Sequence, residues 1–436
     1  MKGFMKSLDC NNHNLIFAGH DTVELAEKYG TPLYILSEDI IRQRCWELKA
    51  NFLHRYKNTK AAYASKAFLT LTMCKIIESE GLLLDVVSGG ELYTALKAEF
   101  PTERIIFHGN NKSYEELEMA IENNVGRIIV DCGDEIDIID QIAKEKNKDV
   151  KILIRVSPGV AGKTHKYIST GQKDSKFGIP LVKGIIDKVV MKALESSNIE
   201  LLGFHFHLGS NLYDNDGYTV AIEVVLNLMK WIYDEFNFTA KELNTGGGFG
   251  IYYNNMDEVK ELAYYTDAIM SKVISYSMKL GLDVPTIVIE PGRWIVGEAG
   301  ITLYKIGAIK EIPGVRTYVS IDGGLPDNPR PALYNAKYHA IVANKCNQRP
   351  NSLVTIAGKC CESGDILIWD LMVPKVERGD ILAVLSTGAY NYSMSSNYNK
   401  IPRPAVVLLS KDKEQVIVRR ETYEDLISKE VIPEGL

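Results

Sequence analysis

The chain has 436 residues, of which 46% are hydrophobic and 24% charged, and these ordinary globular proportions argue against a disordered chain. Its formal net charge is −6 with lysine and arginine scattered along the chain, so no surface for nucleic acid or anionic membranes is indicated. The sequence has no apolar run of membrane-spanning length, no signal-peptide core in its first twenty residues, and seven cysteines without a disulfide or CxxC pattern. We therefore expect a soluble cytoplasmic protein with reduced thiols.

The first two thirds of the chain alternate short strand-like segments with helical patterns. Two capping boxes, Ser88 with Glu91 and Ser113 with Glu116, mark helix starts between them. Eight strand–helix pairs over roughly 230 residues are typical of a (β/α)8 TIM barrel, and a doubly wound open sheet is the alternative. The eight strands are expected at residues 60–65, 82–87, 104–108, 127–131, 151–156, 200–207, 241–245 and 286–290.

From about residue 300 the pattern changes, and strands follow one another without a long helix between them. Two N-terminal segments, 14–19 and 31–37, also look like strands and are expected to join the C-terminal sheet. The predicted fold class is α/β. Its three parts are N-terminal strands in 1–40, the barrel in 41–299, and a mainly antiparallel β-sandwich or barrel domain in 300–436.

Polar residues stand at the ends of all eight predicted barrel strands. The active site of a (β/α)8 barrel lies at the C-terminal ends of its strands, so these side chains are expected to meet at one rim. In chain order they are Lys66, Ser88–Gly90, His108–Asn110, Asp131, Arg155, His205 with His207 and Ser210, Gly246–Gly248, and Glu290 with Arg293.

Three of these features suggest a phosphorylated, nitrogen-containing ligand. Lys66 is either an ordinary solvated lysine or an amine that desolvation turns into a nucleophile. The run "TGGGFG" (245–250) is either a flexible turn or a cradle of backbone N–H groups for a phosphate. Glu290 ends an apolar run, where burial is costly unless a cation or a protonated ring nitrogen meets the carboxylate. These are the parts that a pyridoxal-phosphate enzyme needs.

The pair "HFH" raises the possibility of a metal site. Residues two apart in a strand point the same way, so His205 and His207 face one side, a spacing that suits zinc. A zinc site needs further ligands, and only His108 and Asp131 are offered by the other strand ends. Stacking of an imidazole on an aromatic cofactor ring is the other explanation.

The predicted β domain carries a second group of motifs. "RPALY" (330–334) places a guanidinium and a phenol four residues apart, which suits a carboxylate ligand. "CCESGD" (360–365) sets a thiol beside a carboxylate, or is only a loop with two buried cysteines, and "TGAYN" (387–391) puts a tyrosine on a glycine turn.

Together these motifs resemble diaminopimelate decarboxylases, within the wider group of barrel-type pyridoxal-phosphate decarboxylases and alanine racemases. The resemblance covers nearly the whole chain. It rests on YASKA (63–67), HGNNKS (108–113), YISTGQKDSKFG (167–178), GFHFHLGS (203–210), TGGGFG (245–250), EPGR (290–293), DGG and RPALY (322–334), CESGD (361–365) and GAY (388–390).

The resemblance implies roles for several of the motif residues. Lys66 would carry pyridoxal 5′-phosphate as a Schiff base, His207 would stack on its ring, and Glu290 would pair with the ring nitrogen. Cys361, the proton donor, and Glu362, a substrate contact, would come from the partner subunit of a head-to-tail homodimer. The phosphate group would be held by Ser210, Gly246, Gly247, Gly248 and Tyr390. The substrate would be held by Arg293, Arg330, Tyr334 and Tyr390. Arg293 would also contribute to the cofactor site.

The implied reaction is decarboxylation of meso-2,6-diaminopimelate to L-lysine and CO2, the last step of lysine biosynthesis, with no metal ion. An ornithine or arginine decarboxylase would want an acid where Arg330 stands. A secondary-metabolism decarboxylase of another carboxylated or carrier-bound amino acid, a catalytically silent relative and a metal-dependent hydrolase stay open, whereas the carboxylate clamp disfavours a racemase. Cys361 is chosen over Cys360 because it directly precedes Glu-Ser-Gly-Asp.

Overall fold

A computed structural model describes residues 8–160, 174–254, 256–411 and 413–436, so the motif YISTGQKDSKFG (167–178) lies partly outside the described residues. The chain divides into two compact units, a β unit (Met1–Gln43, Ile251–Asp257 and Val296–Leu436) and a barrel unit (Arg44–Gly250 and Glu258–Ile295). Residues 251–257 lie inside the range expected for the barrel but group with the β unit.

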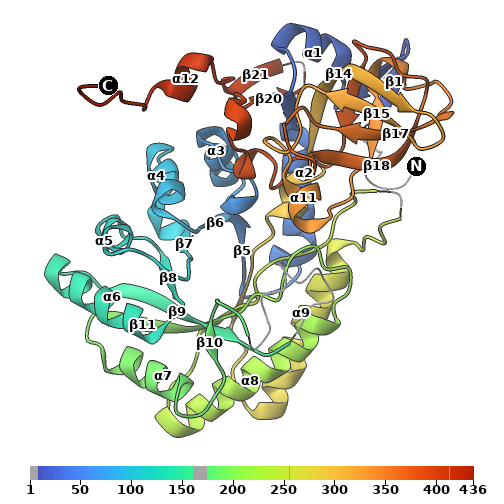
Figure 1. Ribbon diagram of the computed structural model, residues 1–436. Helices are drawn as coiled ribbons and strands as arrows, with labels where there is room; N and C mark the ends of the chain where they lie inside the picture. Colours follow the sequence, from blue (N-terminus) through green and yellow to red (C-terminus); the bar gives the residue numbers. More distant parts are fainter. Residues whose placement is uncertain (1–7, 161–173, 255, 412) are drawn as a thin grey trace. The chain divides into compact units, whose positions relative to one another are not determined.

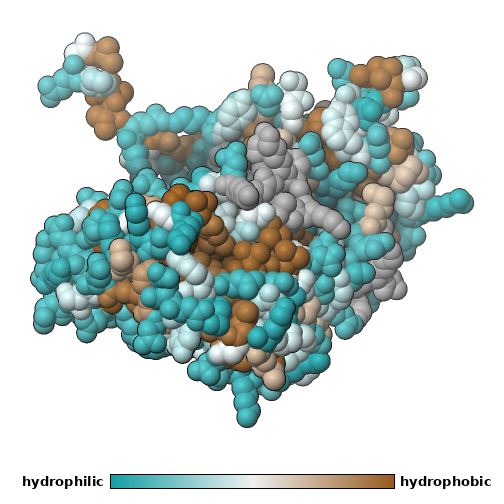
Figure 2. All heavy atoms as spheres, turned by 90° about the horizontal axis from the view of Figure 1, so that it is seen from below, coloured by the Kyte–Doolittle hydropathy of each residue, from teal (hydrophilic) through white to brown (hydrophobic). Residues whose placement is uncertain are grey.

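Figure 2 shows hydrophilic side chains over much of one face, with apolar patches between them. Within the described residues, none of the helices combines the length and hydropathy that a membrane crossing requires.

The barrel unit is a closed ring of eight parallel strands, so the prediction of a TIM barrel is confirmed (Figure 1). Ile287 of the last strand pairs with Thr59 of the first, and this pairing closes the ring that an open doubly wound sheet would leave open. The strands in ring order are β5 (Thr59–Ala64), β6 (Leu83–Val86), β7 (Ile105–Phe107), β8 (Arg127–Val130), β9 (Val150–Ser157), β11 (Ile199–His205), β12 (Glu242–Asn244) and β13 (Thr286–Ile289).

Helices follow the barrel strands in the expected alternation. One of the two predicted capping boxes is complete, at Ser113 and Glu116. At Ser88 only the serine half forms, because the Glu91 carboxylate accepts hydrogen bonds from Val87 N and Ser65 Oγ, both at 2.7 Å. The main helices are α3 (Leu71–Ser79), α4 (Gly89–Lys97), α5 (Tyr114–Glu122), α6 (Gly133–Lys146), α7 (Ile186–Glu195), α8 (Asp216–Phe236) and α9 (Leu262–Leu280).

The β unit is built on a sheet in the order β18-β17-β15-β14-β4-β20-β21. The N-terminal strand β4 (Leu33–Ser37) lies within it, antiparallel to β14 (Gly300–Ile312) and parallel to β20 (Ala405–Ser410), as the sequence predicted. The other strands are β15 (Arg316–Ile321), β17 (Ser352–Ala357), β18 (Ile366–Val373) and β21 (Lys413–Val418), with β16 (Ala340–Val342) and β19 (Ile381–Val384) pairing beside β14.

The expectation for residues 14–19 was wrong in part. Strand β2 (Asn14–Phe17) pairs with β1 (Leu8–Asn11) and β3 (His20–Asp21) in a separate three-stranded sheet. It still packs on the core of the β unit, because Leu15 and Phe17 are buried in the same apolar cluster as residues of β4, β14 and β20. Apolar alternation places a strand face toward a core, but it does not specify which backbone edge the strand pairs with.

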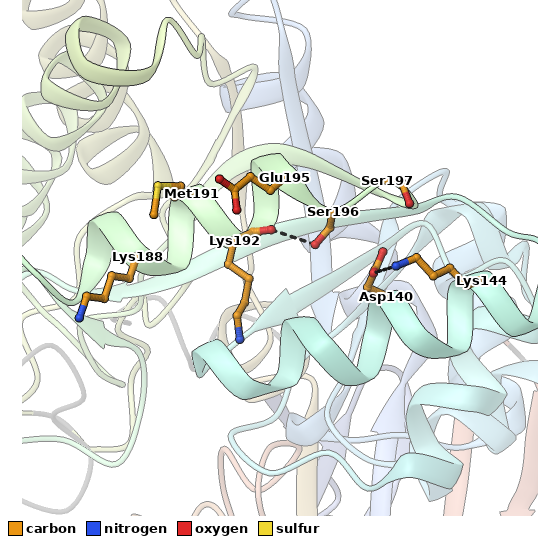
Figure 3. A pocket seen from close by; sticks show the side chains of 8 residues that line it. All are labelled: Asp140, Lys144, Lys188, Met191, Lys192, Glu195, Ser196 and Ser197. Atoms are coloured by element: carbon orange, nitrogen blue, oxygen red, sulfur yellow. Dashed lines mark hydrogen bonds and ion pairs between the residues drawn. The ribbon is translucent and has the colours of Figure 1, made fainter.

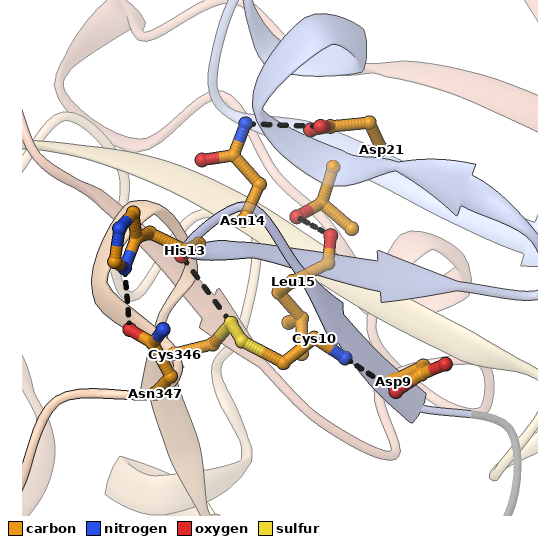
Figure 4. Close-up of a disulfide and its surroundings, with 9 residues drawn as sticks. Asp9, Cys10, His13, Asn14, Leu15, Asp21, Cys346 and Asn347 are labelled. Carbon is orange, nitrogen blue, oxygen red and sulfur yellow. Dashed lines mark hydrogen bonds between the residues drawn. A yellow bond between two sulfur atoms is a disulfide. The ribbon is translucent and has the colours of Figure 1, made fainter.

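The expectation of seven reduced thiols is also corrected. Cys10 and Cys346 form a disulfide within the β unit, with Cα atoms 6.1 Å apart (Figure 4). Next to it, His13 Nδ1 and Asn347 Oδ1 form a 2.8 Å hydrogen bond. The two cysteines are 336 positions apart in sequence, so no spacing pattern could indicate the pair. The free cysteines among the described residues are Cys45, Cys74, Cys132, Cys360 and Cys361.

A buried ion pair joins the first residues of strands β8 and β12 inside the barrel unit. Arg127 Nε and Nη2 donate to the two carboxylate oxygens of Glu242 at 2.6 and 2.9 Å, and Lys60 Nζ lies 3.2 Å from Glu242 Oε2. The Lys60 side chain is 41% exposed and that of Glu242 only 4%. The carboxylate therefore depends on Arg127 for its compensation.

We predict that Arg127→Met lowers the free energy of unfolding by about 3–5 kcal/mol, because it leaves a buried carboxylate unpaired. The matched variant Lys60→Met should cost no more than about 1 kcal/mol, because that pair is partly exposed. Urea denaturation of the three proteins measures both values. An equal cost for the two variants would contradict the role assigned to Arg127.

Candidate active site

Glu290 lies at the end of β13, is only 6% exposed, and sits between side chains from three other strands. Its Oε1 lies 2.8 Å from His108 Nε2 and accepts a hydrogen bond from Asn244 Nδ2 at 2.6 Å. Its Oε2 lies 3.4 Å from His205 Nε2. Burial acts to raise the pKa of Glu290, but the imidazoles of His108 and His205 outweigh it and hold this pKa well below the usual value. The carboxylate is therefore ionised at neutral pH.

His205 and Asp85 complete this buried polar cluster. Burial lowers the pKa of His205 to about 3, so its imidazole is neutral, and its contact with Glu290, at 3.4 Å, is longer than the 2.8 Å contact of His108. Its ring packs edge-on against His108, with centroids 4.9 Å apart. Asp85 Oδ1 lies 3.8 Å from His108 Nε2, and burial raises the pKa of Asp85 to about 6. The sequence placed both histidines at strand ends, but it did not connect either of them with Glu290.

The residues that could bind a metal ion in the structure differ from those that the sequence suggested. Donor atoms of His108, His205 and Glu290 lie within 4.8 Å of one another. Asp131 is engaged elsewhere, because its Oδ2 accepts from Gly178 N at 3.1 Å and its Oδ1 lies 3.7 Å from Arg155 Nε. The 2.8 Å separation between His108 and Glu290 is that of a direct hydrogen bond, which fits a shared proton better than a bridging zinc ion.

Lys66 follows β5 in a single 3-10 turn (Ser65–Ala67). Both of its neighbours are buried, whereas Lys66 itself is exposed at the barrel end. The positive charge of Lys66 influences two nearby carboxyl groups. Burial raises the pKa of Asp85 and of Glu91, and the charge of Lys66 opposes that rise. The amine therefore lies close to the cluster around Glu290, as expected for a functional lysine.

The glycine run is packed too closely for side chains. A Cβ on Gly247 would lie 2.0 Å from the carbonyl oxygen of Glu290, and one on Gly248, at φ +104°, would lie 2.1 Å from that of Gly209. The amide of Gly247 donates to His207 Nδ1 at 3.3 Å. His207 is partly exposed, and burial followed by the charge of Lys66 holds its pKa well below the usual value. A neutral imidazole and a closely packed glycine turn therefore lie side by side at this rim.

Two further residues of the expected site meet in the barrel unit. Arg293 begins the short helix α10 (Arg293–Val296) and is only 5% exposed. Its Nη2 donates to Ser210 Oγ at 2.8 Å. Several residues of the expected site therefore belong to the barrel unit, namely Lys66, His207, Ser210, Gly246–Gly248, Glu290 and Arg293.

In the β unit, Arg330 begins helix α11 (Arg330–Tyr334) and is 5% exposed. Its Nη1 donates to Tyr338 Oη at 2.7 Å, and its guanidinium carbon lies 5.0, 5.8 and 6.0 Å from the ring centres of Tyr253, Tyr338 and Tyr390. Burial acts to lower the pKa of Arg330, but Tyr253 and Tyr338 raise it and the net direction is upward. Among the described residues no carboxylate pairs with this buried cation. Motifs indicated Arg330, Tyr334 and Tyr390 but gave no signal for Tyr253 and Tyr338.

The cysteine loop lies between β17 and β18. Cys360 is partly buried and its N–H donates to Asp365 Oδ2 at 2.9 Å; burial and the nearby carboxylate raise its thiol pKa to about 12. Cys361 and Glu362 are exposed, and the Cys361 N–H donates to Asn399 Oδ1 at 2.8 Å. Of the two cysteines, Cys361 is therefore the more exposed, and its choice as the proton donor stays a prediction.

A separate pocket of about 410 Å³ lies on the outside of the barrel unit, between helices α6 and α7 (Figure 3). Two of its lysines are already neutralised, because Lys144 pairs with Asp140 at 2.5 Å and Lys192 with Asp137 at 2.6 Å. It contains none of the strand-end residues. This pocket is therefore not the candidate site.

The comparisons with known proteins identify the family of this chain. The family described as "Pyridoxal-dependent decarboxylase, pyridoxal binding domain" matches residues 39–297. This chain belongs to the pyridoxal-dependent decarboxylase family. A relative in Bacillus subtilis (strain 168) named diaminopimelate decarboxylase is 50% identical over 418 residues, which is 96% of this chain and 95% of the relative.

Solved structures of family members share the whole fold. The crystal structure of diaminopimelate decarboxylase from M. jannaschii matches with a TM-score of 0.93 and 37% identity over 99% of each chain. A second crystal structure of that protein, in co-complex with L-lysine, matches with a TM-score of 0.92. The resemblance inferred from the motifs and the expected cofactor class are thus confirmed.

The residues present fit the cofactor of this family. The glycine turn carries no side chain that could cover it, as a backbone cradle for a phosphate requires, and Gly247 and Gly248 have no room for one. Glu290 is an ionised buried carboxylate, which suits a protonated pyridine nitrogen. Lys66 stands at the same rim with its amine exposed. Pyridoxal 5′-phosphate therefore matches the donors and acceptors of the barrel unit.

We predict that Gly247→Ala disrupts this site. The added Cβ must push the Glu290 backbone aside, at a cost of about 1–3 kcal/mol in stability. Cofactor affinity should fall about tenfold or more. Titration of the apoprotein with pyridoxal phosphate, followed by absorbance, measures this loss. Gly90→Ala is the control, since its Cβ would meet only Ser88 Oγ at 3.8 Å; an equal loss in both variants would contradict the close-approach argument.

Proposed function

We propose that this protein decarboxylates meso-2,6-diaminopimelate to L-lysine and CO2, with pyridoxal 5′-phosphate bound at the barrel rim. The observation that carries the proposal is the buried Arg330 cation, which has no acidic partner among the described residues. Such a cation is costly unless an anionic ligand meets it. Relatives at 41–50% identity bear the name of this activity, and L-lysine is bound in a solved structure of the family.

The substrate's distal end explains why an arginine is needed. Diaminopimelate differs from lysine by a second carboxylate, and a guanidinium binds a carboxylate in a bidentate fork. Arg330 would hold that group, with Tyr334 and Arg293 as further contacts. An ornithine- or arginine-type enzyme has to hold a distal cation instead, which Arg330 would repel. The arginine therefore favours a substrate with a distal carboxylate.

The barrel residues would hold the cofactor. Lys66 would bind it covalently, and His207 would lie against its ring. Its phosphate would be held by Gly246–Gly248 and Ser210, with Tyr390 of the β unit as a further contact. When bound, pyridoxal phosphate supplies an electron sink for the electron pair left by the departing CO2. Glu290 would keep a proton on the ring nitrogen and so maintain that sink. Fixing both ends of the substrate orients the bond to be broken, which is a positioning task.

The proton that replaces CO2 would come from Cys361. Its exposure and its loop position beside Glu362 suit a group that acts outside its own subunit. We infer a head-to-tail homodimer in which each site receives Cys361 and Glu362 from the partner subunit. Cys360 is unsuited to the role because its thiol is partly buried against Asp365.

The reaction is tested by CO2 release from purified protein with meso-diaminopimelate, beside L-ornithine, L-arginine and L-lysine, with and without pyridoxal phosphate. We expect cofactor-dependent release from diaminopimelate alone. Arg330→Met should lower kcat/KM at least about 100-fold, because a charge-assisted bidentate contact is worth roughly 3 kcal/mol. Release from another substrate would assign the protein to a specialised decarboxylase. Metal-dependent turnover without the cofactor would favour a hydrolase.

Sharing of sites is tested by mixing two inactive variants, Lys66→Ala and Cys361→Ala. Each heterodimer would contain one intact site, so about a quarter of the wild-type activity should return if subunits exchange at random. Cys360→Ala is the matched control and should keep most activity on its own. Failure of the mixture to recover activity, although the subunits exchange, would contradict a shared site.

A further inference from the structure

We propose that His108 is a positioning residue that fixes the Glu290 carboxylate for the cofactor's ring nitrogen. This inference rests on the proposed function, since it concerns the same cofactor site. No motif-based role reached His108, which lies one residue beyond β7 and is 5% exposed.

Among the described residues, the two short hydrogen bonds to the Glu290 side chain both go to Oε1, whereas Oε2 has only His205 Nε2 nearby, at 3.4 Å. Nε2 of His108 lies 2.8 Å from Oε1, and because an ionised carboxylate can only accept, Nε2 carries the proton and donates. Asn244 Nδ2 donates to the same oxygen at 2.6 Å. With two donors on Oε1, the lone pairs of Oε2 are the ones left for a protonated ring nitrogen.

The orientation of Asn244 is itself fixed. Its Oδ1 accepts a hydrogen bond from Gly246 N at 2.9 Å, so its Nδ2 is the end that faces Glu290. Asn244 thereby links the glycine turn to the carboxylate. His108 is the second anchor and comes from another strand end, so the carboxylate is held from two sides and cannot rotate without losing a hydrogen bond.

Comparison of the groups around Glu290 indicates that His108 is the one that stabilises its negative charge most. Besides Glu290, the titratable groups that interact with His108 among the described residues include Asp85, at 3.8 Å, His205 and Glu91. His205 is neutral because burial lowers its pKa to about 3, and its Nε2 is farther from the carboxylate, at 3.4 Å. Arg155 interacts electrostatically with the carboxyl groups of Asp85 and Glu290, and burial lowers the pKa of Arg155. His108 therefore makes the short donor contact that compensates the buried carboxylate.

The test is cofactor binding by the apoprotein of wild type, His108→Leu and His108→Gln, together with the pH at which the absorbance of the bound cofactor changes. We expect His108→Leu to lower cofactor affinity at least about tenfold and to shift that pH, because Glu290 loses a donor. His108→Gln retains an N–H donor and should stay within about threefold of wild type. A purely structural role would lower the melting temperature without moving the absorbance titration.

Wild-type affinity and an unchanged titration in folded His108→Leu would overturn the inference and leave the proposed function standing. Absence of pyridoxal phosphate binding by the wild type would overturn both. Should His108→Leu not fold, wild-type protein with 15N-labelled histidine decides the question. The inference requires a protonated Nε2 on His108, and a deprotonated Nε2 would contradict it.

Discussion

The functional site depends on one buried carboxylate that remains ionised. Removing the charge of Glu290 from water is costly, and among the described residues the barrel meets that cost with hydrogen-bond donors from other strand ends, with no lysine or arginine ion pair to this carboxylate. His108 and Asn244 both donate to Oε1, and the net effect holds the pKa of Glu290 well below its usual value. A carboxylate held in this way is ready to pair with a cation that arrives with a ligand.

Barrel closure makes that arrangement possible. Residues far apart in sequence become neighbours because eight parallel strands end on one rim, and the register between β12 and β13 brings Asn244 beside Val288, two residues before Glu290. The glycine turn then packs directly on the backbone of Glu290, with no room for a side chain at Gly247. The cradle for a phosphate and the partner for a ring nitrogen are therefore parts of one closely packed structure.

Sequence reasoning found what depends on local pattern. The eight strands, the change to β structure near residue 300 and the polar strand ends follow from periodicity and from residue types at strand termini. It could not find contacts that depend on tertiary register. Tyr253 belongs to a seven-residue segment that joins the β unit, and Tyr338 lies after the clamp motif, so their rings meet Arg330 only in the folded chain. The disulfide between Cys10 and Cys346 was missed for the same reason.

The central claim is that the barrel rim holds pyridoxal phosphate on Lys66. Borohydride reduction of the cofactor-loaded protein fixes the cofactor to the lysine that carries it, and peptide mass spectrometry then identifies that lysine. We expect one label per chain, on the peptide that contains Lys66, and none in a Lys66→Arg variant. A label on another lysine of the barrel, such as Lys112, or an equal label in Lys66→Arg, would contradict it.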